Sequence, residues 1–366
     1  MSGASELRRR LAELVAFDTQ NPTGDERPAV EMLARELRTL GARAVETFEA
    51  EGHHAVYGRF GDEAPSLLVN AHVDTVPANS GYTSPPHTLV ERDGRPHGLG
   101  SADTKGAIAA ILEALSAKAA ERRLPRGVGV LFSGDEERGS NACIRAFLSS
   151  GRARGLARAI VCEPTGGRVG SRHRGIGIAE AVATSVGGHS SRADNVPNPL
   201  ITLAHAALAL DDWGRRWREL GPPGFRGLCL NIAAIDGGVA FNVIPTTATL
   251  RLSLRPAPGA DVRELISEAE GEARRAAAPQ DIDWRLVHAS PPFATRDLAA
   301  FEPLLGERVR APADLAFWTE AALFAASGID AVVFGPGSIE QAHSADEYVE
   351  VSQLEMARDA FLRIFS

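Results

Sequence analysis

Apolar side chains recur at helical spacing in several stretches of the chain. Leu7, Leu11 and Leu14 are three or four positions apart and therefore fall on one face of an α-helix. The same spacing predicts helices at residues 7–15, 30–40, 105–122, 199–217, 261–278 and 352–365.

Short apolar runs without polar interruption separate these helices in the first half of the chain and near its end. Their length is that of strands buried in a covered sheet. We predict strands at residues 55–60, 67–71, 128–132, 159–162 and 331–334. Strands that alternate with helices in this way predict an α/β sheet with helices on both faces.

The middle third of the chain has a different pattern. Strands are expected at 175–186, 228–235, 243–254 and 284–288, and the helices at 199–217 and 261–278 lie between them. The resulting β-α-β-β-α-β order predicts a separate α+β domain, a four-stranded sheet with two helices on one face.

Composition and charge narrow the class of protein. The 366 residues suffice for two domains, and 44% hydrophobic and 23% charged residues are typical of a globular protein. A net charge of −8 without a basic run argues against nucleic acid as a partner. We expect neither a membrane span nor a signal peptide, because no apolar stretch is long enough for a span and the N-terminus lacks an apolar core.

The three cysteines also bear on location. The chain has an odd number of cysteines, and all three are widely spaced and lie in apolar stretches: Cys143, Cys162 and Cys229. They predict buried, reduced thiols and not a disulfide framework, which favours a cytoplasmic protein.

Five polar residues form a candidate cage for two metal ions. Each of them ends a predicted strand, precedes a predicted helix or follows the last strand, and ligands collect at the carboxyl ends of strands in such sheets. The five are His72, Asp103, Glu137, Glu163 and His343. Imidazole and carboxylate suit zinc and its neighbours. With two histidines and three carboxylates, each ion can have one histidine and one carboxylate as ligands, and the remaining carboxylate can bridge the two ions.

Two further carboxylates accompany this set. Glu136 stands beside Glu137 and is free to act as a base. Asp74 follows His72 by two positions and is expected to accept the other ring N–H of that histidine, which would fix its tautomer.

His343 belongs with ligands from the first half, so the end of the chain must rejoin the first domain. We therefore predict a discontinuous catalytic domain, residues 1–173 and 289–366, and an inserted domain at 174–288.

Each of these residues also has an ordinary interpretation. Asp103 can be the N-cap of the following helix, and Glu136 with Glu137 can be a solvated pair that opens a helix. Glu163 can be a plain strand exit, and His343 a surface histidine. Five further histidines lack a partner pattern and are assigned to the surface or to packing: His53, His54, His87, His97 and His205. His173 is left open.

Two residues of the inserted domain remain open in the same way. His189, in Gly187-Gly188-His189, is a loop histidine that stabilises its own turn or a functional group. Arg255 is a surface arginine or a bidentate clamp for a substrate carboxylate.

The motifs together resemble one enzyme family. AHVDTVP, GSADTKG, GDEE, EPT and QAH occur in the order found in the di-zinc amidohydrolases, which include acetylornithine deacetylase, succinyl-diaminopimelate desuccinylase, aminoacylase and carboxypeptidase G enzymes. The resemblance covers nearly the whole chain. It implies a mixed-sheet, zinc-peptidase-like catalytic domain and an inserted lid domain through which a homodimer forms.

The resemblance also implies roles for individual residues. His72 and Glu163 hold one zinc ion, Glu137 and His343 hold the other, and Asp103 bridges them; cobalt is able to substitute. Glu136 is the general base, and Asp74 is the carboxylate behind His72. His189 acts on the active site of the partner subunit, and Asn242, Arg255, Thr319 and Gly335 meet the substrate.

Details within the motifs favour one branch of that family. Glu163, where aminoacylase and carboxypeptidase relatives have Asp, favours the deacetylases and desuccinylases. The segments 318–321 (WTEA) and 335–338 (GPGS) resemble enzymes that act on acetylornithine and acetylcitrulline. The expected reaction is hydrolysis of an N-acetyl-L-amino acid in arginine biosynthesis. A desuccinylase, an exopeptidase or aminoacylase with the same cage, and a metal-free binding protein are the alternatives.

Overall fold

The computed structural model describes residues 3–366, which form two compact units. Unit 1 comprises the chain up to Ser171 together with Thr295–Asp314 and Thr319–Ser366. Unit 2 comprises Arg172–Ala294 and the short return Leu315–Trp318. The expected boundaries were 173/174 and 288/289, whereas these units meet at 171/172 and 294/295 and the chain returns to unit 2 at 315–318. No helix of the described residues is long and apolar enough to cross a membrane.

A nine-stranded mixed sheet forms the centre of unit 1, and its last strands carry the chain into and out of unit 2. The order is β1-β2-β6-β3-β7-β17-β8-β15, with β16 paired to β8. The bounds are β1 Ala44–Ala50, β2 His53–Phe60, β3 Leu67–His72, β6 Val128–Ser133, β7 Arg158–Val161, β8 Gly170–His173, β15 Phe293–Ala294, β16 Ala313–Leu315 and β17 Asp330–Val333. Strands β6, β3, β7 and β17 run parallel, so their carboxyl ends share one edge.

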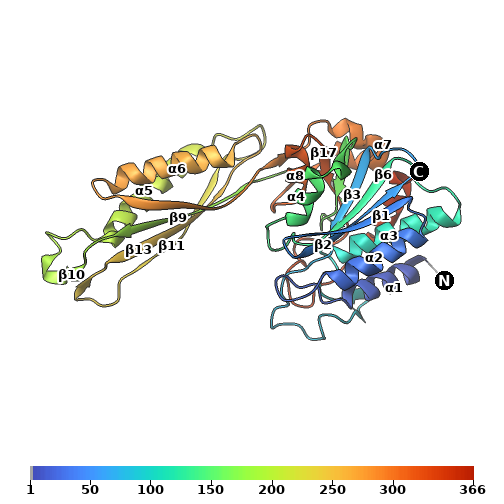
Figure 1. Cartoon of the computed structure of the whole chain (residues 1–366), viewed down its shortest axis with the longest axis horizontal. Coiled ribbons are helices and arrows are strands. Elements are labelled where there is room, and N and C mark those ends of the chain that lie inside the picture. The colour runs from blue at the N-terminus through green and yellow to red at the C-terminus, as the bar shows by residue number, and fades with distance from the viewer. Residues whose placement is uncertain (1–2) are drawn as a thin grey trace. The chain divides into compact units, whose positions relative to one another are not determined.

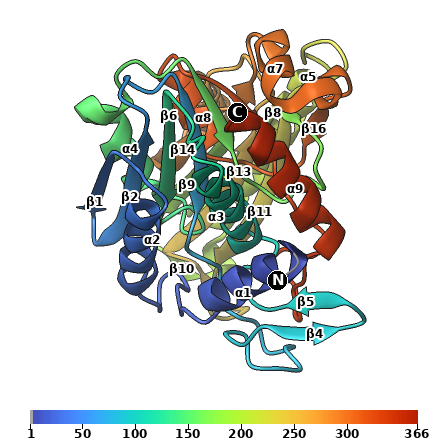
Figure 2. The same cartoon turned by 90° about the vertical axis from the view of Figure 1, so that its right-hand side faces the viewer.

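Helices cover both faces of this sheet, as predicted. Every residue of β3 and β6 is buried, which requires apolar layers on both sides. The helices are α1 Gly3–Val15, α2 Arg27–Thr39, α3 Lys105–Ala120, α4 Ala142–Ser149, α7 Glu302–Leu305, α8 Ala321–Ala326 and α9 Val351–Ile364. On one side α1, α3 and α9 pack together (Figure 2), and their side chains form the main core with α2. Helices α4 and α8 contact β2, β7 and β17.

Unit 2 contains the predicted four-stranded antiparallel sheet, with the order β11-β13-β9-β14. The bounds are β9 Ile176–Thr184, α5 Pro199–Arg218, β11 Cys229–Gly237, β13 Thr247–Arg255, α6 Val262–Ala277 and β14 Ile282–Ser290. Alternate residues of β13 are buried, namely Ala248, Leu250, Leu252 and Leu254, and they pack into the core shared with both helices. Figure 1 shows α5 and α6 side by side on that face.

Two predictions for unit 2 need correction. The expected strand at 243–254 is broken into β12 Val243–Ile244 and β13, because Pro245 between them has no N–H to continue a ladder. β12 pairs instead with β10 Gly188–His189. Cys229 is exposed on the edge strand β11, whereas Cys143 and Cys162 are buried as expected.

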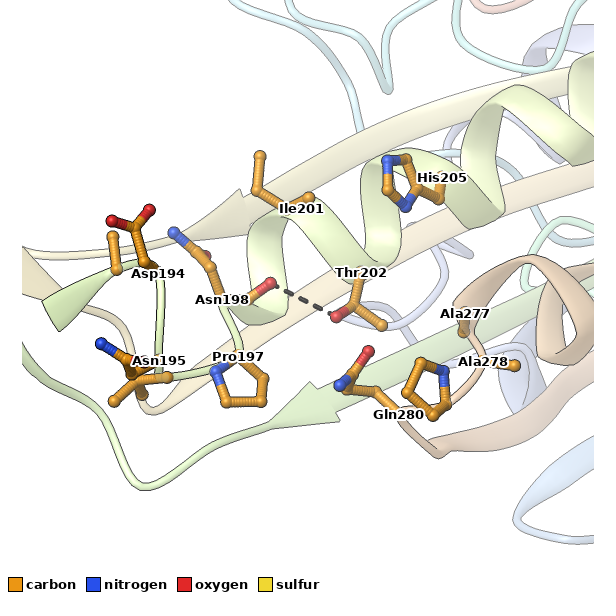
Figure 3. A pocket seen from close by; sticks show the side chains of 13 residues that line it. Asp194, Asn195, Pro197, Asn198, Ile201, Thr202, His205, Ala277, Ala278 and Gln280 are labelled. Atoms are coloured by element: carbon orange, nitrogen blue, oxygen red, sulfur yellow. Dashed lines mark hydrogen bonds between the residues drawn. The ribbon is translucent and has the colours of Figure 1, made fainter.

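Each unit also has a smaller feature outside its main sheet. A two-stranded sheet of β4 Val90–Arg92 and β5 Arg95–His97 lies in unit 1. In unit 2 a cavity of about 530 Å³ lies between the start of α5 and the end of α6 (Figure 3). Asp194, Asn198, His205 and Gln280 contribute to its lining. A single carboxylate and one imidazole are too few ligands for a metal ion, so this cavity is not a candidate metal site.

Candidate metal centre

Strand ends bring the predicted ligands to one edge of the sheet in unit 1. His72 is the last residue of β3, Glu137 follows β6 by four residues, and Glu163 follows β7 by two. Because these strands are parallel, their carboxyl ends lie next to one another. His343 comes from the turn region after β17, which is parallel to β7.

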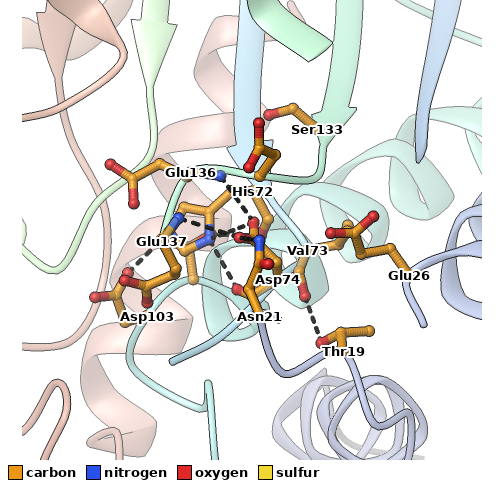
Figure 4. Close-up of polar contacts among 12 residues, drawn as sticks. Thr19, Asn21, Glu26, His72, Val73, Asp74, Asp103, Ser133, Glu136 and Glu137 are labelled. Atoms are coloured by element: carbon orange, nitrogen blue, oxygen red, sulfur yellow. Dashed lines mark hydrogen bonds and ion pairs between the residues drawn. The ribbon is translucent and has the colours of Figure 1, made fainter. Parts of the chain in front are cut away.

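Asp103 lies between the two histidines, and Figure 4 shows it close to Glu137. Its Oδ1 is 3.0 Å from Nε2 of His72, and its Oδ2 is 3.5 Å from Nε2 of His343. The same nitrogen of His343 is 3.1 Å from Oε1 of Glu137. Ligand atoms of His72, Asp103 and Glu137 all lie within 4.8 Å of one another, the spacing of groups that share a metal ion. Asp103 thus presents one oxygen to each histidine.

The structure excludes the N-cap interpretation of Asp103. The N-cap residue of α3 is Thr104, which makes no side-chain capping bond. The Thr104 hydroxyl instead donates to the carbonyl oxygen of His72, 2.8 Å away. This contact connects the turn that carries Asp103 to the end of β3.

Glu163 is buried without a partner for one of its oxygens. Glu163 is only 4% exposed, and its Oε1 accepts no hydrogen bond from the described residues. Burial raises the pKa of Glu163 well above its usual range, and the nearby carboxylates of Asp103 and Glu136 raise it further. A buried carboxylate that repels its neighbours and has a vacant acceptor fits a site built for cations.

The two histidines also have raised pKa values, which in their case favours the charged form. Burial lowers the pKa of His72, but the hydrogen bond to Asp103 and the nearby carboxylate of Asp74 outweigh this effect and hold that pKa well above its usual range. Hydrogen bonds to Asp103 and Glu137 raise the pKa of His343 to about 10. Without cations, protons therefore balance the carboxylates, and cation binding must displace those protons.

Asp74 holds the paired glutamates rather than the imidazole. Its carboxylate accepts the backbone N–H groups of Glu136 and Glu137, at 3.2 and 3.1 Å, and the side-chain amide of Asn21 at 3.1 Å. The acceptor for Nδ1 of His72 is the backbone carbonyl of Asp74, 2.9 Å away, while the carboxylate is at 3.6 Å. The expected fixing of the ring thus comes from the backbone of Asp74.

The side chain of Glu136 lies beside His72 (Figure 4), and no hydrogen bond joins it to the proposed ligands among the described residues. Burial raises the pKa of its carboxyl well above the usual range, and the charges of Glu137 and Glu320 raise it further, although His72 opposes them. A carboxyl group with a raised pKa is suited to accept and return a proton near neutral pH.

The residues expected to meet substrate are distributed over both units. In unit 1, Thr319 is buried at the start of α8, and Gly335 approaches Glu163 so closely that a Cβ would lie 2.7 Å from its carbonyl oxygen. The hydroxyl of Thr165 accepts the N–H of Gly335 at 3.1 Å. Gly335 is therefore required where the turns after β7 and β17 meet.

In unit 2, His189 and Asn242 lie together and Arg255 does not. The N–H of Ser190 donates to the carbonyl of Asn242, 3.0 Å away, and Nδ1 of His189 contacts the hydroxyl of Ser191 at 2.9 Å. His189, Asn242 and Ser191 are exposed, and Ser190 is half-buried. Arg255 ends β13 eight residues after its first residue, so about 27 Å of strand separates it from the His189 end of the sheet.

Sequence reasoning missed several supporting residues. Glu347 accepts three backbone N–H groups from the turn that carries Asp103, and Asn21 bonds Asp74. His53 was assigned to the surface or to packing, yet its Nδ1 lies 2.8 Å from Glu26 and its Nε2 3.4 Å from Asp135. For Glu347, the indication in the sequence was a carboxylate four residues after His343.

Comparison with known proteins agrees with this geometry. A family model described as peptidase family M20/M25/M40 matches residues 68–366. N-acetyl-L-citrulline deacetylase of Xanthomonas campestris is 33% identical over 380 residues, which cover 97% of this chain and 96% of that protein. Acetylornithine deacetylase of Myxococcus xanthus is 32% identical over 371 residues, which cover 95% of this chain and 93% of that protein.

Solved structures share the fold over the whole length. A tripeptidase from Staphylococcus aureus superposes with a TM-score of 0.78 at 18% identity, covering 99% of this chain and 97% of that one. A dinuclear metal binding peptidase of the M20 family from Bacillus subtilis gives 0.72 at 14% identity, with coverage of 99% and 97%. The motifs, the sheet with its separate four-stranded domain, and the grouped imidazoles and carboxylates have one explanation: this chain is an enzyme of peptidase family M20/M25/M40.

Proposed function

We propose that this enzyme removes the acetyl group from an N-acetyl-L-amino acid, either N-acetyl-L-citrulline or N2-acetyl-L-ornithine, and releases acetate and the free amino acid. The observation that carries the proposal is Asp103, whose two oxygens face His72 and His343 while Glu136 lies alongside. The two deacetylase relatives, matched over nearly the full length, support the choice of substrate class.

Two divalent cations fit the donor set. His72 and Glu163 would hold one ion, Glu137 and His343 the other, and Asp103 would contact both. Zinc suits imidazole and carboxylate donors, and cobalt is expected to substitute for it. Such a pair supplies Lewis acidity and lowers the pKa of nearby water.

The side chains of the chain itself manage the proton. Glu136 takes a proton from the attacking water and later delivers it to the leaving nitrogen, so the free amine departs instead of an amide anion. Asp74 supports this role because it binds the backbone N–H groups of both Glu136 and Glu137. The base and the adjacent ligand are therefore oriented by one carboxylate.

Unit 2 supplies the remaining groups in this proposal, as lid and as dimer surface. His189 would donate to the oxyanion that forms during attack, Asn242 would contact the substrate nearby, and Arg255 would bind the substrate carboxylate. His189 and Asn242 lie at the end of the four-stranded sheet opposite to the residues where the chain enters and leaves unit 2. This placement supports a homodimer in which His189 serves the partner subunit.

A side-by-side rate comparison tests the substrate. The purified enzyme, loaded with zinc or cobalt, is given acetylcitrulline, acetylornithine, acetylmethionine, succinyl-diaminopimelate and a dipeptide. We expect the highest kcat/KM for acetylcitrulline or acetylornithine. A higher value for succinyl-diaminopimelate would make the enzyme a desuccinylase, a higher value for acetylmethionine an aminoacylase, and a higher value for the dipeptide would assign it to the exopeptidases.

A further inference from the structure

Glu347 is a buried carboxylate that the reaction itself does not use. The residue is 2% exposed and follows His343 by four positions in the segment that leads into α9. Burial of this carboxyl group costs free energy that only good hydrogen bonding offsets. What it bonds therefore indicates what it does.

All three hydrogen bonds of the Glu347 side chain go to one turn. Oε2 accepts the backbone N–H of Gly100 at 2.8 Å, and Oε1 accepts those of Ala102 and Asp103 at 2.8 and 3.0 Å. Gly100 has a φ of +78°, a left-handed conformation that glycine adopts without strain. The turn just before α3 thus directs three N–H groups to a single side chain.

The same stretch is joined to the turn through its backbone. The N–H of Gly98 donates to the carbonyl oxygen of Glu347 at 2.9 Å, and the N–H of Val349 donates to the carbonyl oxygen of Pro96 at 3.3 Å. One side chain therefore connects two turns that each carry a ligand, Asp103 on one and His343 on the other.

We propose that Glu347 is a positioning residue for the metal centre. It fixes the backbone of Asp103 relative to the turn of His343 before any cation arrives, so that the oxygens of Asp103 already face both histidines. The inference rests on the proposed metal centre and deepens it. Glu347 does not contact the reacting atoms and acts through Asp103.

Asp346, the preceding residue, offers a matched control. Its carboxylate also makes three contacts, with the N–H of Thr83 at 2.9 Å, the hydroxyl of Thr83 at 2.7 Å and the guanidinium of Arg92 at 3.1 Å. These contacts anchor the same segment, but to residues away from the Asp103 turn. Substitution of Asp346 loosens the segment without removing an acceptor from the ligand turn.

Amide hydrogen exchange in the metal-free protein tests the structural step directly. In the wild type we expect the N–H groups of Gly100, Ala102 and Asp103 to be protected. Glu347→Gln, which keeps the shape but replaces one acceptor oxygen by a donor, is expected to remove protection from at least one of them. Asp346→Asn is expected to leave all three protected. Equal protection in the wild type and Glu347→Gln would overturn the proposal.

Calorimetric titration of metal-free protein with Zn²⁺ tests the consequence. We expect Glu347→Gln to weaken binding about 10- to 100-fold, the usual effect of losing a residue that orients a ligand. Asp346→Asn should bind within about twofold of the wild type, because it leaves the ligand turn intact. Glu347→Asp keeps the charge on a shorter side chain and should fall between, which also keeps the test open if Glu347→Gln does not fold.

The failure modes are distinct. A Glu347→Gln protein that melts at lower temperature but binds Zn²⁺ like the wild type would reduce Glu347 to a general stabiliser and overturn the inference, with the proposed function intact. A wild type that binds no divalent cation would overturn the proposed metal centre and this inference together. A different preferred substrate would leave both metal-binding results unchanged.

Discussion

The ligand edge of unit 1 and the His189 end of unit 2 hold their functional residues in opposite ways. His72, Asp103 and Glu163 are 2%, 6% and 4% exposed, and Asp103 is held by Glu347 through its backbone. The side chain of His343 is 49% exposed, but its ring contacts both Asp103 and Glu137. His189 is exposed on the two-residue strand β10, and its ring contacts Ser191 of its own turn.

The proposed metal centre is therefore formed by residues of one chain, whereas the proposed role of His189 requires a partner subunit. Buried carboxylates crowded together are stable only when their geometry is fixed and their charges are balanced. An exposed histidine on a short strand gains a fixed geometry only when another surface covers it. Variants at the ligand edge should therefore act within one chain, and variants at the His189 end should depend on assembly.

The largest effect is expected at Glu136. Glu136→Gln removes the proton acceptor while it keeps the size of the side chain, so kcat should fall about 10²- to 10⁴-fold. Metal content, measured by elemental analysis, should equal that of the wild type. Glu340→Gln, an exposed glutamate near His343, is the control and should leave kcat unchanged. Full turnover in Glu136→Gln with metal bound would remove it as the base.

At the other end of the comparison, His189→Ala should lower kcat about 10²- to 10³-fold through loss of an oxyanion donor. Mixing it with Glu136→Ala sharpens the test, because neither variant alone has a complete set. If His189 serves the partner, random exchange of subunits should restore about a quarter of the wild-type activity, since half of the dimers are mixed and each has one intact site. Mixed dimers without activity would contradict the role in the partner.

Asp74→Asn probes the support beneath the ligand edge. The amide cannot accept from Glu136, Glu137 and Asn21 as the carboxylate does, so zinc affinity should fall about 10- to 100-fold. Titration of the metal-free protein measures this. Asp62→Asn, whose side chain is 80% exposed, should bind zinc like the wild type. Unchanged affinity in Asp74→Asn would show that the edge is held without it.

The smallest effect concerns the pair formed by His53, the first residue of β2, and Glu26, the residue before α2. Burial lowers the pKa of His53, but Glu26 and Asp135 outweigh this effect and raise it above the usual value. A raised folded pKa gives stability that is fully present below about pH 6.5 and is lost as pH rises through the folded value.

His53→Gln should accordingly reduce the free energy of unfolding by about 0.5–1 kcal/mol at pH 6 and by less at pH 9. Urea unfolding of metal-free protein at the two pH values measures it, with His205→Gln in unit 2 as the control. A loss of unfolding free energy in His53→Gln that grows as the pH rises would contradict this role of the pair.

Much of the fold was predictable because local pattern and tertiary structure agree. Apolar runs such as residues 67–71 are buried on both sides, and β13 alternates as a strand with one covered face should. β1 escaped prediction because its exposed and half-buried residues give no apolar run. The break at Pro245 was predictable from proline chemistry, but the β-branched residues on both sides, Val243 and Ile244 before it and Thr246 and Thr247 after it, favour one continuous strand.

In the candidate site, too, some residues were predictable from the sequence and others were not. The placement of His72, Glu137 and Glu163 after strand ends on one edge of the sheet was predictable from position and residue type. Glu347 acts on backbone N–H groups about 245 residues away in sequence, and no side-chain pattern encodes such a contact. The acceptor for the ring of His72 was misassigned within Asp74 for the same reason: carbonyl directions depend on the folded turn.

The number of divalent ions bound by one chain tests the central claim most directly. Native mass spectrometry of metal-free protein titrated with Zn²⁺ should find two ions in the wild type, and one in His343→Ala at ion concentrations that fill both wild-type sites, because His72, Glu163 and Asp103 still hold the other. His97→Ala should keep both. A wild type that binds fewer than two ions, or a His343→Ala variant that binds two as tightly as the wild type, would contradict a shared two-ion centre.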